Sequence, residues 1–519
     1  MPGERDTQTE TLPLRIVVVG GGSSGWLVAG YLATLGRANS KSALDITLIE
    51  APQIARIGVG EATVPSICSS LSILGIPEAE FISATKATWK QAIAFEGWRD
   101  GADKFFHPFD RRQVGAPDRH VQNWLDSDRS IEWASYISPQ AHFCRMGLSP
   151  KPPGKSADYR SPLPYAFHMD AEAFGDLLKS RFAGEDVNHV EAKVTGARRS
   201  SDGRIEALEL ENEAAVSADL FIDCTGSRGA LIGDVMGVDL QSFSDHLLCD
   251  RAVALRIPRQ SGDDGLRAYT RSVAMSSGWR WDIPLQDRTG NGYVYSSAHL
   301  TADEAEAELR GALGSASQNV EARHLRFCVG RREVFWEKNV LAIGMAGGFI
   351  EPLESTAIYL VEAAAGLLTT LLPSLGQPSG QTALASAFNQ SMGVLYDEVL
   401  DFVNLHYVLS ARRDTPFWRD ATAPERRTER ISALLDLWEH KSPSNFDFPY
   451  PLRLFSAQSY EHILFGLDPA RACGRAPGGR PPQPLAAVEA AIETGRKGLL
   501  TTEQSLATWM SNRREPAHV

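Results

Sequence analysis

The chain has 519 residues, of which 43% are hydrophobic and 22% charged, and its formal net charge at pH 7 is −12. This length is enough for about three domains, or for one large α/β body with an appended lobe. The acidic balance argues against a nucleic-acid surface, because such surfaces need clustered excess Lys and Arg.

The N-terminal residues, the cysteines and the most apolar run indicate in which cellular compartment the protein is expected. Residues 1–13 are polar and lack the apolar core of a signal peptide, so we expect a flexible tail. The six cysteines form no C-x-x-C pair, which indicates neither a zinc site nor a disulfide framework. The apolar run at 357–372 contains Glu362 and is shorter than the about 20 residues of a membrane span. We therefore expect a cytoplasmic protein without a metal site or a membrane contact.

The first predicted element is an apolar strand that runs into glycines, Arg15-Ile-Val-Val-Val-Gly-Gly-Gly-Ser-Ser-Gly-Trp26. A strand, G-x-G-x-x-G and a helix in this order are typical of dinucleotide-binding folds. Gly20 permits the tight turn, Gly22 lets the backbone approach a pyrophosphate, and Gly25 allows close helix packing. The phosphates would lie on the helix N-terminal amides, at Ser23 and Ser24.

A second predicted strand, at 44–50, ends in Glu50, which is placed to bind a ribose hydroxyl. The alternative is an ordinary strand-helix turn with a surface glutamate. Residues 51–65, with two glycines, bracketing prolines and small residues such as Ala62, predict a loop against a cofactor.

Two segments that follow contain candidate pocket residues. Lys90 lies among aromatic and aliphatic neighbours, where a lysine that reaches water is a more common outcome than a catalytic one. His107 and Phe109, in Phe105-Phe-His-Pro-Phe109, either line a pocket for a flat substrate or fill a core turn. Residues 110–165, rich in Asp, Arg, Ser and Pro, are expected to form long surface excursions.

An amphipathic helix is predicted at 171–182, and a hairpin turn at 201–203. Residues 218–229 repeat the pattern of a buried strand followed by glycines. In the strand predicted near 278–285, Trp279 and Trp281 point to one face, and Pro284 indicates an edge or a strand end. The two indoles either cap a core or wall off a cavity.

A glycine-rich turn that begins at Gly344 leads into a helix that Pro373 ends. Ser355 or Thr356 is the candidate N-cap, and the free amides of this N-terminus could bind an anion such as a halide. Residues 384–512 are predicted to be mostly helical, with breaks near 443–451 and 476–484.

Several of these segments together resemble the flavin-dependent halogenases of the tryptophan halogenase type. The W-x-W-x-I-P element is the specific one, because it separates these enzymes from flavin monooxygenases. The matching pieces are Gly20–Gly25, Gly58-Val-Gly-Glu-Ala-Thr-Val-Pro65, Lys90 within Thr-Trp-Lys, Trp279-x-Trp281-x-Ile283-Pro284, Glu351-Pro-Leu-Glu-Ser-Thr356, Leu405-His-Tyr407 and Asp414-Thr-Pro-Phe-Trp418.

The resemblance implies an α/β fold. It would combine a glutathione reductase/hydroxylase-like, Rossmann-type FAD-binding domain with a mixed β-sheet substrate region and a mostly helical C-terminal lobe. The expected division is a tail at 1–13, an FAD-binding core with an interleaved substrate region at 14–383, and a lobe at 384–519 that completes the substrate pocket.

The resemblance also implies an FADH2-dependent halogenase supplied by a separate NAD(P)H flavin reductase. The glycine turn, Glu50, Ala62 and Gly344 would hold FAD, and oxygen would give a flavin hydroperoxide. Chloride or bromide at Thr356 and Ala357 would then give hypohalous acid. The acid would pass through a tunnel lined by five residues, Ser355, Trp279, Trp281, Ile283 and Pro284.

Lys90 would receive the hypohalous acid, either by hydrogen bonding or as a haloamine. Glu354 would stabilise the cationic ring intermediate or activate the lysine. A desolvated lysine suits this role because burial lowers its pKa and leaves a nucleophilic amine.

The substrate end departs from the family. Residues 448–465 show no recognisable clamp for the ammonium and carboxylate of an amino acid. The sequence therefore favours free indole or an indole derivative, held by His107 and Phe109, over free tryptophan. Ala357 stands where these enzymes usually carry glycine, so bromide preference over chloride is a further hypothesis.

Three alternatives stay open: a tryptophan halogenase that acts on the free amino acid, a single-component flavin hydroxylase, and a non-catalytic flavin-binding protein. Met345 argues against the hydroxylase, since many hydroxylases have an Asp after this glycine. A homodimer is also left open.

Overall fold

The computed structural model describes residues 13–514 except 41–42, 54–59, 111–118, 154–155, 260–264, 376–379, 451 and 471. The tail expected before residue 13 lies outside the described residues, as does the central part of the loop expected against a cofactor.

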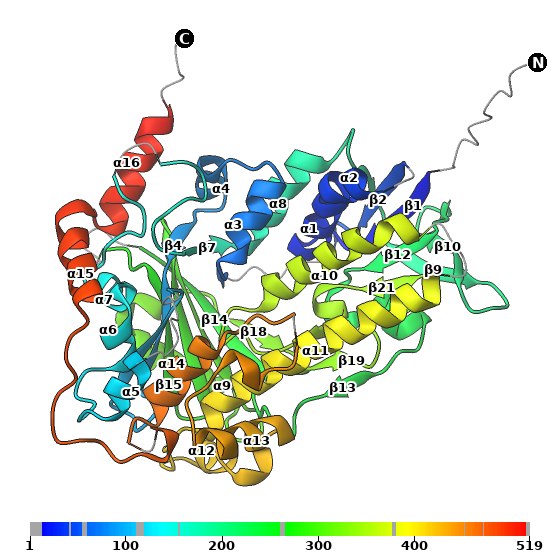
Figure 1. The fold of residues 1–519 in the computed structure, drawn as a ribbon. Helices are drawn as coiled ribbons and strands as arrows, with labels where there is room; N and C mark the ends of the chain where they lie inside the picture. Colours follow the sequence, from blue (N-terminus) through cyan, green and yellow to red (C-terminus); the bar gives the residue numbers. More distant parts are fainter. Residues whose placement is uncertain are drawn as a thin grey trace, which may run out of the picture.

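A six-stranded sheet forms one half of the molecule, at the right of Figure 1. Its strands, in spatial order, are β20 (Trp336–Glu337), β21 (Val340–Ala342), β12 (Leu220–Asp223), β1 (Leu14–Val19), β2 (Leu44–Glu50) and β8 (Asn188–Glu191). All neighbours run parallel except β20 and β21. A parallel strand with helices on both sides is apolar throughout, as the buried run at 16–19 is.

Helices cover this sheet and complete its crossovers. α1 (Ser23–Tyr31) follows β1 directly and contacts α8 (Ala171–Phe182) and α10 (Ala357–Leu371). The predicted strand, glycine turn and helix at the N-terminus are confirmed, as is the helix at 171–182. Shorter or flanking helices are α2 (Arg37–Asn39), α3 (Ser66–Ile73), α4 (Glu78–Ala84) and α9 (Ala302–Leu313).

A seven-stranded, mostly antiparallel sheet forms the second half. Its order is β18 (Arg323–Arg326), β14 (Arg251–Pro258), β17 (Arg288–Tyr295), β16 (Gly278–Pro284), β15 (Tyr269–Met275), β5 (Ala92–Glu96) and β6 (Lys104–Pro108). Trp279 and Trp281 lie on one face of β16 with ring centroids 6.3 Å apart, as the two-residue period predicts. Pro284 ends the strand, as predicted.

Three small sheets complete the strands. They are β3 (Gly60–Ala62), β7 (Ala166–Asp170) and β4 (Thr88–Lys90); β11 (Ala215–Val216), β10 (Ile205–Leu210) and β9 (Val194–Arg199); and β13 (Leu240–Ser242), β19 (Gly330–Arg332) and β22 (Gly348–Phe349). The predicted turn at 201–203 joins β9 to β10.

The surface excursions expected at 110–165 are in large part wrong. Three helices lie there: α5 (Arg119–Leu125), α6 (Trp133–Ile137) and α7 (Pro139–Arg145). Trp124 and Trp133 are buried and pack edge to face. Ser and Pro, which suggested loops, instead begin a helix, since the Ser138 side chain caps α7 and Pro139 occupies its first position.

The C-terminal quarter is mostly helical, as predicted. Its helices are α11 (Gln381–Val408), α12 (Pro416–Ala421), α13 (Glu429–Trp438), α14 (Ala457–Leu467), α15 (Ala486–Gly498) and α16 (Thr502–Arg514). α15 and α16 lie at the left of Figure 1, where α15 contacts α7 and α16 contacts α4 and β4. Trp509 of α16 packs edge to face against Trp89, so the end of the chain supports the strand that carries Lys90.

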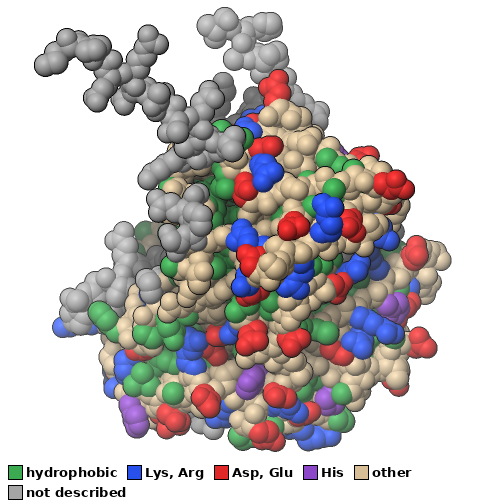
Figure 2. Space-filling view, turned by 90° about the vertical axis from the view of Figure 1, so that its right-hand side faces the viewer, with side chains coloured by type: hydrophobic (Ala, Val, Ile, Leu, Met, Phe, Trp, Pro, Cys, Tyr) green, Lys and Arg blue, Asp and Glu red, His purple; other side chains and the backbone are tan. Residues whose placement is uncertain are grey.

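The apolar run around α10 is longer than the sequence suggested. Together with a 3₁₀ turn at Leu372–Ser374, it forms 18 residues that could cross a membrane by length and composition. Half of this stretch is buried inside the protein, where α10 contacts α1 and α11, as a core helix does. On the face drawn in Figure 2, described basic and acidic side chains alternate without a large area of one sign.

Candidate active site

Lys90 ends β4 in the protein interior, with its side chain fully buried. Its Nζ donates to the Thr63 carbonyl oxygen at 3.0 Å and to Ser355 Oγ at 2.9 Å, and it lies 5.2 Å from the Phe109 ring centroid. Burial lowers the pKa of this lysine to about 7, although the negative charge of Glu354 acts in the opposite direction. The ammonium and the neutral amine are therefore both accessible near neutral pH.

Glu354 lies between two histidines. One carboxylate oxygen is 3.0 Å from His107 Nδ1, and the other is 2.9 Å from His406 Nε2. Burial alone would raise the pKa of Glu354, but the two histidines lower it to about 2. Glu354 makes no hydrogen bond to Lys90 within the described residues, so any activation of the lysine acts through the field of the carboxylate.

The two tryptophans of β16 form a buried wall. Trp279 Nε1 donates to Glu351 at 2.7 Å, and the Tyr407 hydroxyl donates to the same oxygen at 2.7 Å. Burial raises the pKa of Glu351 to about 7. The Trp281 ring covers Gly292, where an added Cβ would lie 1.9 Å from the ring.

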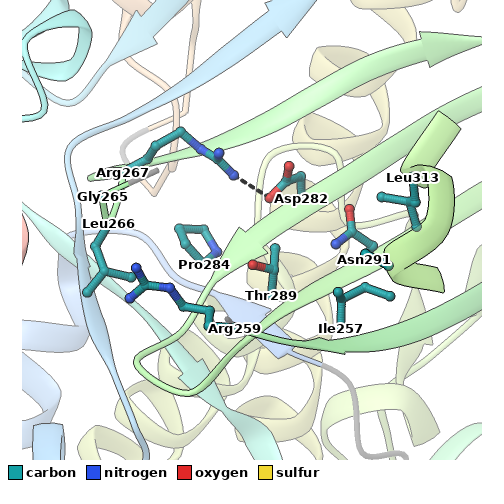
Figure 3. Close-up of a pocket in the computed structure, with 11 residues that line it drawn as sticks. Ile257, Arg259, Gly265, Leu266, Arg267, Asp282, Pro284, Thr289, Asn291 and Leu313 are labelled. Carbon is teal, nitrogen blue, oxygen red and sulfur yellow. Dashed lines mark hydrogen bonds and ion pairs between the residues drawn. The ribbon is translucent and has the colours of Figure 1, made fainter. Parts of the chain in front are cut away.

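The rest of the W-x-W-x-I-P element divides between the two faces of the sheet. Ile283 shares the tryptophan face and lies 3.5 Å from where a Cβ would project at Gly60. Pro284 points away and lines a cavity of about 220 Å³ on the other face, where Arg267 pairs with Asp282 at 2.6 Å (Figure 3). The structure therefore does not bring the Pro284 ring to the tryptophans.

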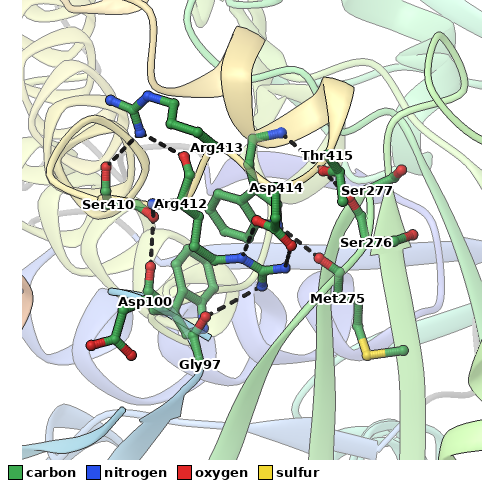
Figure 4. Close-up of polar contacts among 12 residues, drawn as sticks. Gly97, Asp100, Met275, Ser276, Ser277, Ser410, Arg412, Arg413, Asp414 and Thr415 are labelled. Atoms are coloured by element: carbon green, nitrogen blue, oxygen red, sulfur yellow. Dashed lines mark hydrogen bonds and ion pairs between the residues drawn. The ribbon is translucent and has the colours of Figure 1, made fainter. Parts of the chain in front are cut away.

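The segment after α11 fixes the turn that precedes Trp279 (Figure 4). Thr415 Oγ1 donates to the Ser276 carbonyl at 2.7 Å, and Trp418 Nε1 donates to the Met275 carbonyl at 2.8 Å. The Arg412 guanidinium lies 4.6 Å from the Trp418 ring centroid and covers it. These contacts attach the β15–β16 turn to the C-terminal helices.

The glycine turn after β1 leaves a space for a ligand at one position. Gly20 has φ +117°, and a Cβ there would lie 2.2 Å from the Cys224 carbonyl oxygen; at Gly25 a Cβ would lie 1.8 Å from the Gly20 carbonyl oxygen. At Gly22, by contrast, a Cβ would meet nothing within 4 Å. The fold thus requires glycine at positions 20 and 25, whereas Gly22 faces open space.

A family model for tryptophan halogenases matches residues 15–475. The chain belongs to the tryptophan halogenase family. Tryptophan 7-halogenase RebH from Lentzea aerocolonigenes is 36% identical over 446 residues, which cover 82% of this chain and 81% of RebH.

Solved structures agree with this assignment to the tryptophan halogenase family. A tryptophan halogenase from Shewanella frigidimarina NCIMB 400 superposes with a TM-score of 0.88 at 32% identity and covers 98% of this chain and 99% of its own. Tar14, a tryptophan C-6 flavin-dependent halogenase (chlorinase) from taromycin biosynthesis, superposes with a TM-score of 0.85 at 30% identity. The match covers 96% of this chain and 100% of Tar14. These comparisons confirm the predicted fold class and show an oxidoreductase-type enzyme that uses separately supplied reduced flavin.

Membership of the tryptophan halogenase family implies FAD, a halide and oxygen, and the residues around α1 fit FAD. The α1 amides at Ser23 and Ser24 begin a helix that no side chain caps, which suits a pyrophosphate. The Glu50 carboxyl lies over Gly21 at the end of β2, held by Lys179 and His189.

The second glycine turn reaches the same place. A Cβ at Gly344, whose φ is +69°, would lie 2.8 Å from Ser24 Oγ. Ala62 is buried in β3 and precedes Thr63, whose carbonyl accepts from Lys90. The predicted cofactor and lysine positions therefore adjoin through β3 in the described part of the chain.

The N-terminus of α10 fits an anion. Thr356 occupies the N-cap position without a side-chain cap, and neither its amide nor that of Ala357 donates to another described residue. The candidate cap Ser355 instead has φ +60° and accepts the hydrogen bond from Lys90. Among the described residues, no group of three or more His, Cys, Asp or Glu could hold a metal ion.

Sequence reasoning missed two groups at this site. The Thr63 carbonyl carries no sequence signal, because any residue supplies one. His406 was noted only within the Leu405-His-Tyr407 resemblance and was given no role. The available signal was a histidine in the largely apolar stretch 399–408, which the structure buries completely, since buried polar groups need partners.

Proposed function

We propose that this chain halogenates an electron-rich indole ring with chloride or bromide, and that Lys90 delivers the halogen. The buried lysine, hydrogen-bonded beside the N-terminus of α10, is the observation that carries the proposal. When bound, reduced FAD with oxygen supplies the oxidising equivalent that converts halide into hypohalous acid. The remaining roles belong to the chain itself.

The hydrogen bonds of Lys90 suit halogen transfer. A neutral amine has two N–H groups and one lone pair, and the acceptors at Thr63 and Ser355 take both N–H groups. The lone pair is then free to displace hydroxide from hypohalous acid, which gives an N–halogen bond and water after proton loss. The ammonium form has a third N–H, which could instead bind the oxygen of hypohalous acid.

The N-terminus of α10 would hold the halide through the amides of Thr356 and Ala357. Ser355 connects this position to Lys90 through one hydrogen bond. Trp279 and Trp281 would separate the organic substrate from the flavin, so that only the small acid reaches the lysine. His107 and Phe109 would flank the ring that is attacked.

Two substrates compete for this role, tryptophan and free indole or an indole derivative. The relatives are named for tryptophan, which makes it the first substrate to test. The segment in which the sequence shows no amino-acid clamp is engaged elsewhere, since the Leu454 and Phe455 amides donate to Glu398 at 2.8 and 3.1 Å, and Tyr460 packs on Phe448. This packing keeps free indole as the competing proposal.

The test is mass spectrometry of reactions with FAD, an added NAD(P)H flavin reductase, oxygen and bromide or chloride. Tryptophan and indole are offered together. A halogen isotope pattern on either ring supports the proposal and identifies the preferred substrate and halide. A gain of oxygen without halogen would favour a hydroxylase, and flavin binding without any product would favour a non-catalytic protein. The cytoplasmic location, the domain boundaries and a homodimer stay predictions.

A further inference from the structure

The cavity drawn in Figure 3 lies on the face of the seven-stranded sheet that is opposite to the tryptophans. Side chains alternate along β16, so Arg280, Asp282 and Pro284 all point to the cavity face. Directly opposite residues of antiparallel strands share a face, and Asn291 of β17, which is paired with Asp282, therefore points there too. The sheet separates a ligand in this cavity from the tryptophan wall.

Arginines outnumber the carboxylates with which they can pair on this face of the sheet. Asp282 is shared by Arg267 at 2.6 Å and Arg271 at 3.3 Å, and Arg271 also pairs with Glu96 at 2.6 Å. Arg280 is only 6% exposed and makes no ion pair within the described part of the chain. A buried guanidinium is normally paired, because a carboxylate offsets the cost of removing it from water. This region can therefore accommodate a further negative charge.

Two hydrogen-bond donors at the cavity lack acceptors. Arg280 Nη1 donates to Asn291 Oδ1 at 2.9 Å, and since a guanidinium can only donate, the amide nitrogen of Asn291 must face the other way. Asn291 lines the cavity, and this nitrogen donates to none of the described residues. Arg267 Nε is also buried and has no partner among them. Buried donors without acceptors are unfavourable, so the pair indicates a ligand that carries acceptor oxygens.

The size and the remaining lining of the cavity restrict the ligand. The volume is about 220 Å³, which is below the roughly 300–1,000 Å³ of pockets for drug-sized ligands. Much of the lining is apolar, from Ile257, Leu266, Pro284, Leu313 and Ala316. A small molecule with an apolar body and one carboxylate matches both parts of this lining, whereas inorganic phosphate has no apolar part. The side chain of Arg267 is 28% exposed, so the cavity reaches solvent beside it.

We propose that this cavity is a second ligand site, which binds a small carboxylate with an apolar body through Arg267 and the amide nitrogen of Asn291. Arg280, behind Asn291, contributes the positive charge that the ligand carboxylate compensates. Asp282 keeps Arg271 as a partner when Arg267 turns to the ligand. The site is separate from the proposed halogenation and involves no reaction of the bound molecule.

The first experiment is calorimetric titration of the full-length, flavin-free protein at neutral pH and constant sodium chloride. The probes are benzoate, benzyl alcohol, which has a similar size and no charge, and inorganic phosphate. We expect benzoate to bind saturably, benzyl alcohol to give no saturable heat, and phosphate to bind more weakly than benzoate. The absence of saturable benzoate binding, equal binding of benzyl alcohol, or tighter binding of phosphate would overturn the proposal. None of these results depends on halogenation.

Variants then assign the bound benzoate to the cavity. Arg267→Gln removes the guanidinium, and Asn291→Asp keeps the volume but places a negative charge beside Arg280. We expect each to weaken benzoate binding by roughly tenfold or more, which is the scale of a lost hydrogen bond to a charged group. Arg228→Gln is the control, because that side chain is 68% exposed and outside the cavity lining, and it should keep the wild-type affinity.

Crystals grown with para-iodobenzoate give a test that does not depend on the folding of any variant. The anomalous signal of iodine should lie in the cavity, with the carboxylate at Arg267 and Asn291. Wild-type affinity for benzoate in both Arg267→Gln and Asn291→Asp, or iodine only in the pocket of the aromatic substrate, would overturn the proposal.

Discussion

Replacing Lys90 with Met tests whether this lysine is held as a low-pKa amine. The side chain is fully buried, and burial lowers its pKa from 10.5 to about 7. Met has a similar length and no charge, so Lys90→Met removes the titrating group. We expect the variant to bind FAD and to form no halogenated product.

The magnitude follows from the pKa. The difference between 10.5 and about 7 corresponds to roughly 5 kcal/mol, which is the cost of burying the ammonium. The unfolded chain binds this proton more tightly than the folded protein, so the free energy of unfolding rises with pH between about 7 and 10.5. Below pH 7 the full cost applies, and above 10.5 it vanishes. Between pH 6 and pH 9 the wild-type protein should therefore recover roughly 3 kcal/mol, whereas Lys90→Met should not.

The assay is urea denaturation of both flavin-free proteins at pH 6 and pH 9. The acceptors at Thr63 and Ser355 that Met leaves unpaired cost about 1–3 kcal/mol each, but this cost does not depend on pH and cancels in the comparison. Lys497→Met serves as the control, because that lysine side chain is 75% exposed on α15, and its replacement should alter the pH dependence little. If the free energy of unfolding changed equally between pH 6 and pH 9 in the wild type and in Lys90→Met, the lowered pKa of Lys90 would be refuted.

The remaining predictions concern the cofactor, the wall and the halide. Gly22→Ala should leave the melting temperature nearly unchanged but weaken FAD binding in a titration. Gly25→Ala should instead destabilise the fold, because its Cβ would lie 1.8 Å from the Gly20 carbonyl oxygen. Equal melting temperatures in the two variants would contradict this prediction. Trp281→Ala should open the buried wall and raise hydrogen peroxide release per flavin oxidised, measured with a peroxidase-coupled assay. Unchanged hydrogen peroxide release would contradict the role of Trp281 in this wall. Ala357→Gly should change the ratio of brominated to chlorinated product in mixed halide, which mass spectrometry measures, if its amide binds the halide.

Local sequence patterns determined the elements and several site positions. The strand, glycines and helix at 15–26, the helix at 171–182 and the shared face of Trp279 and Trp281 depend on backbone sterics and on the periods of helix and strand. These act over a few residues, so they are legible in the sequence. The same reasoning failed at 119–145, where Ser138 and Pro139 begin one helix and buried tryptophans pack two others together.

The chemistry of the site depended on tertiary structure. The sequence alone suggested a lysine that reaches water, and only folding places Lys90 beside Thr63 and Ser355, the latter 265 positions away. Glu354 likewise acquires its low pKa from His107 and His406, which come from β6 and α11. A pKa is set by the groups and the solvent within a few ångströms, and packing between distant segments decides which groups those are.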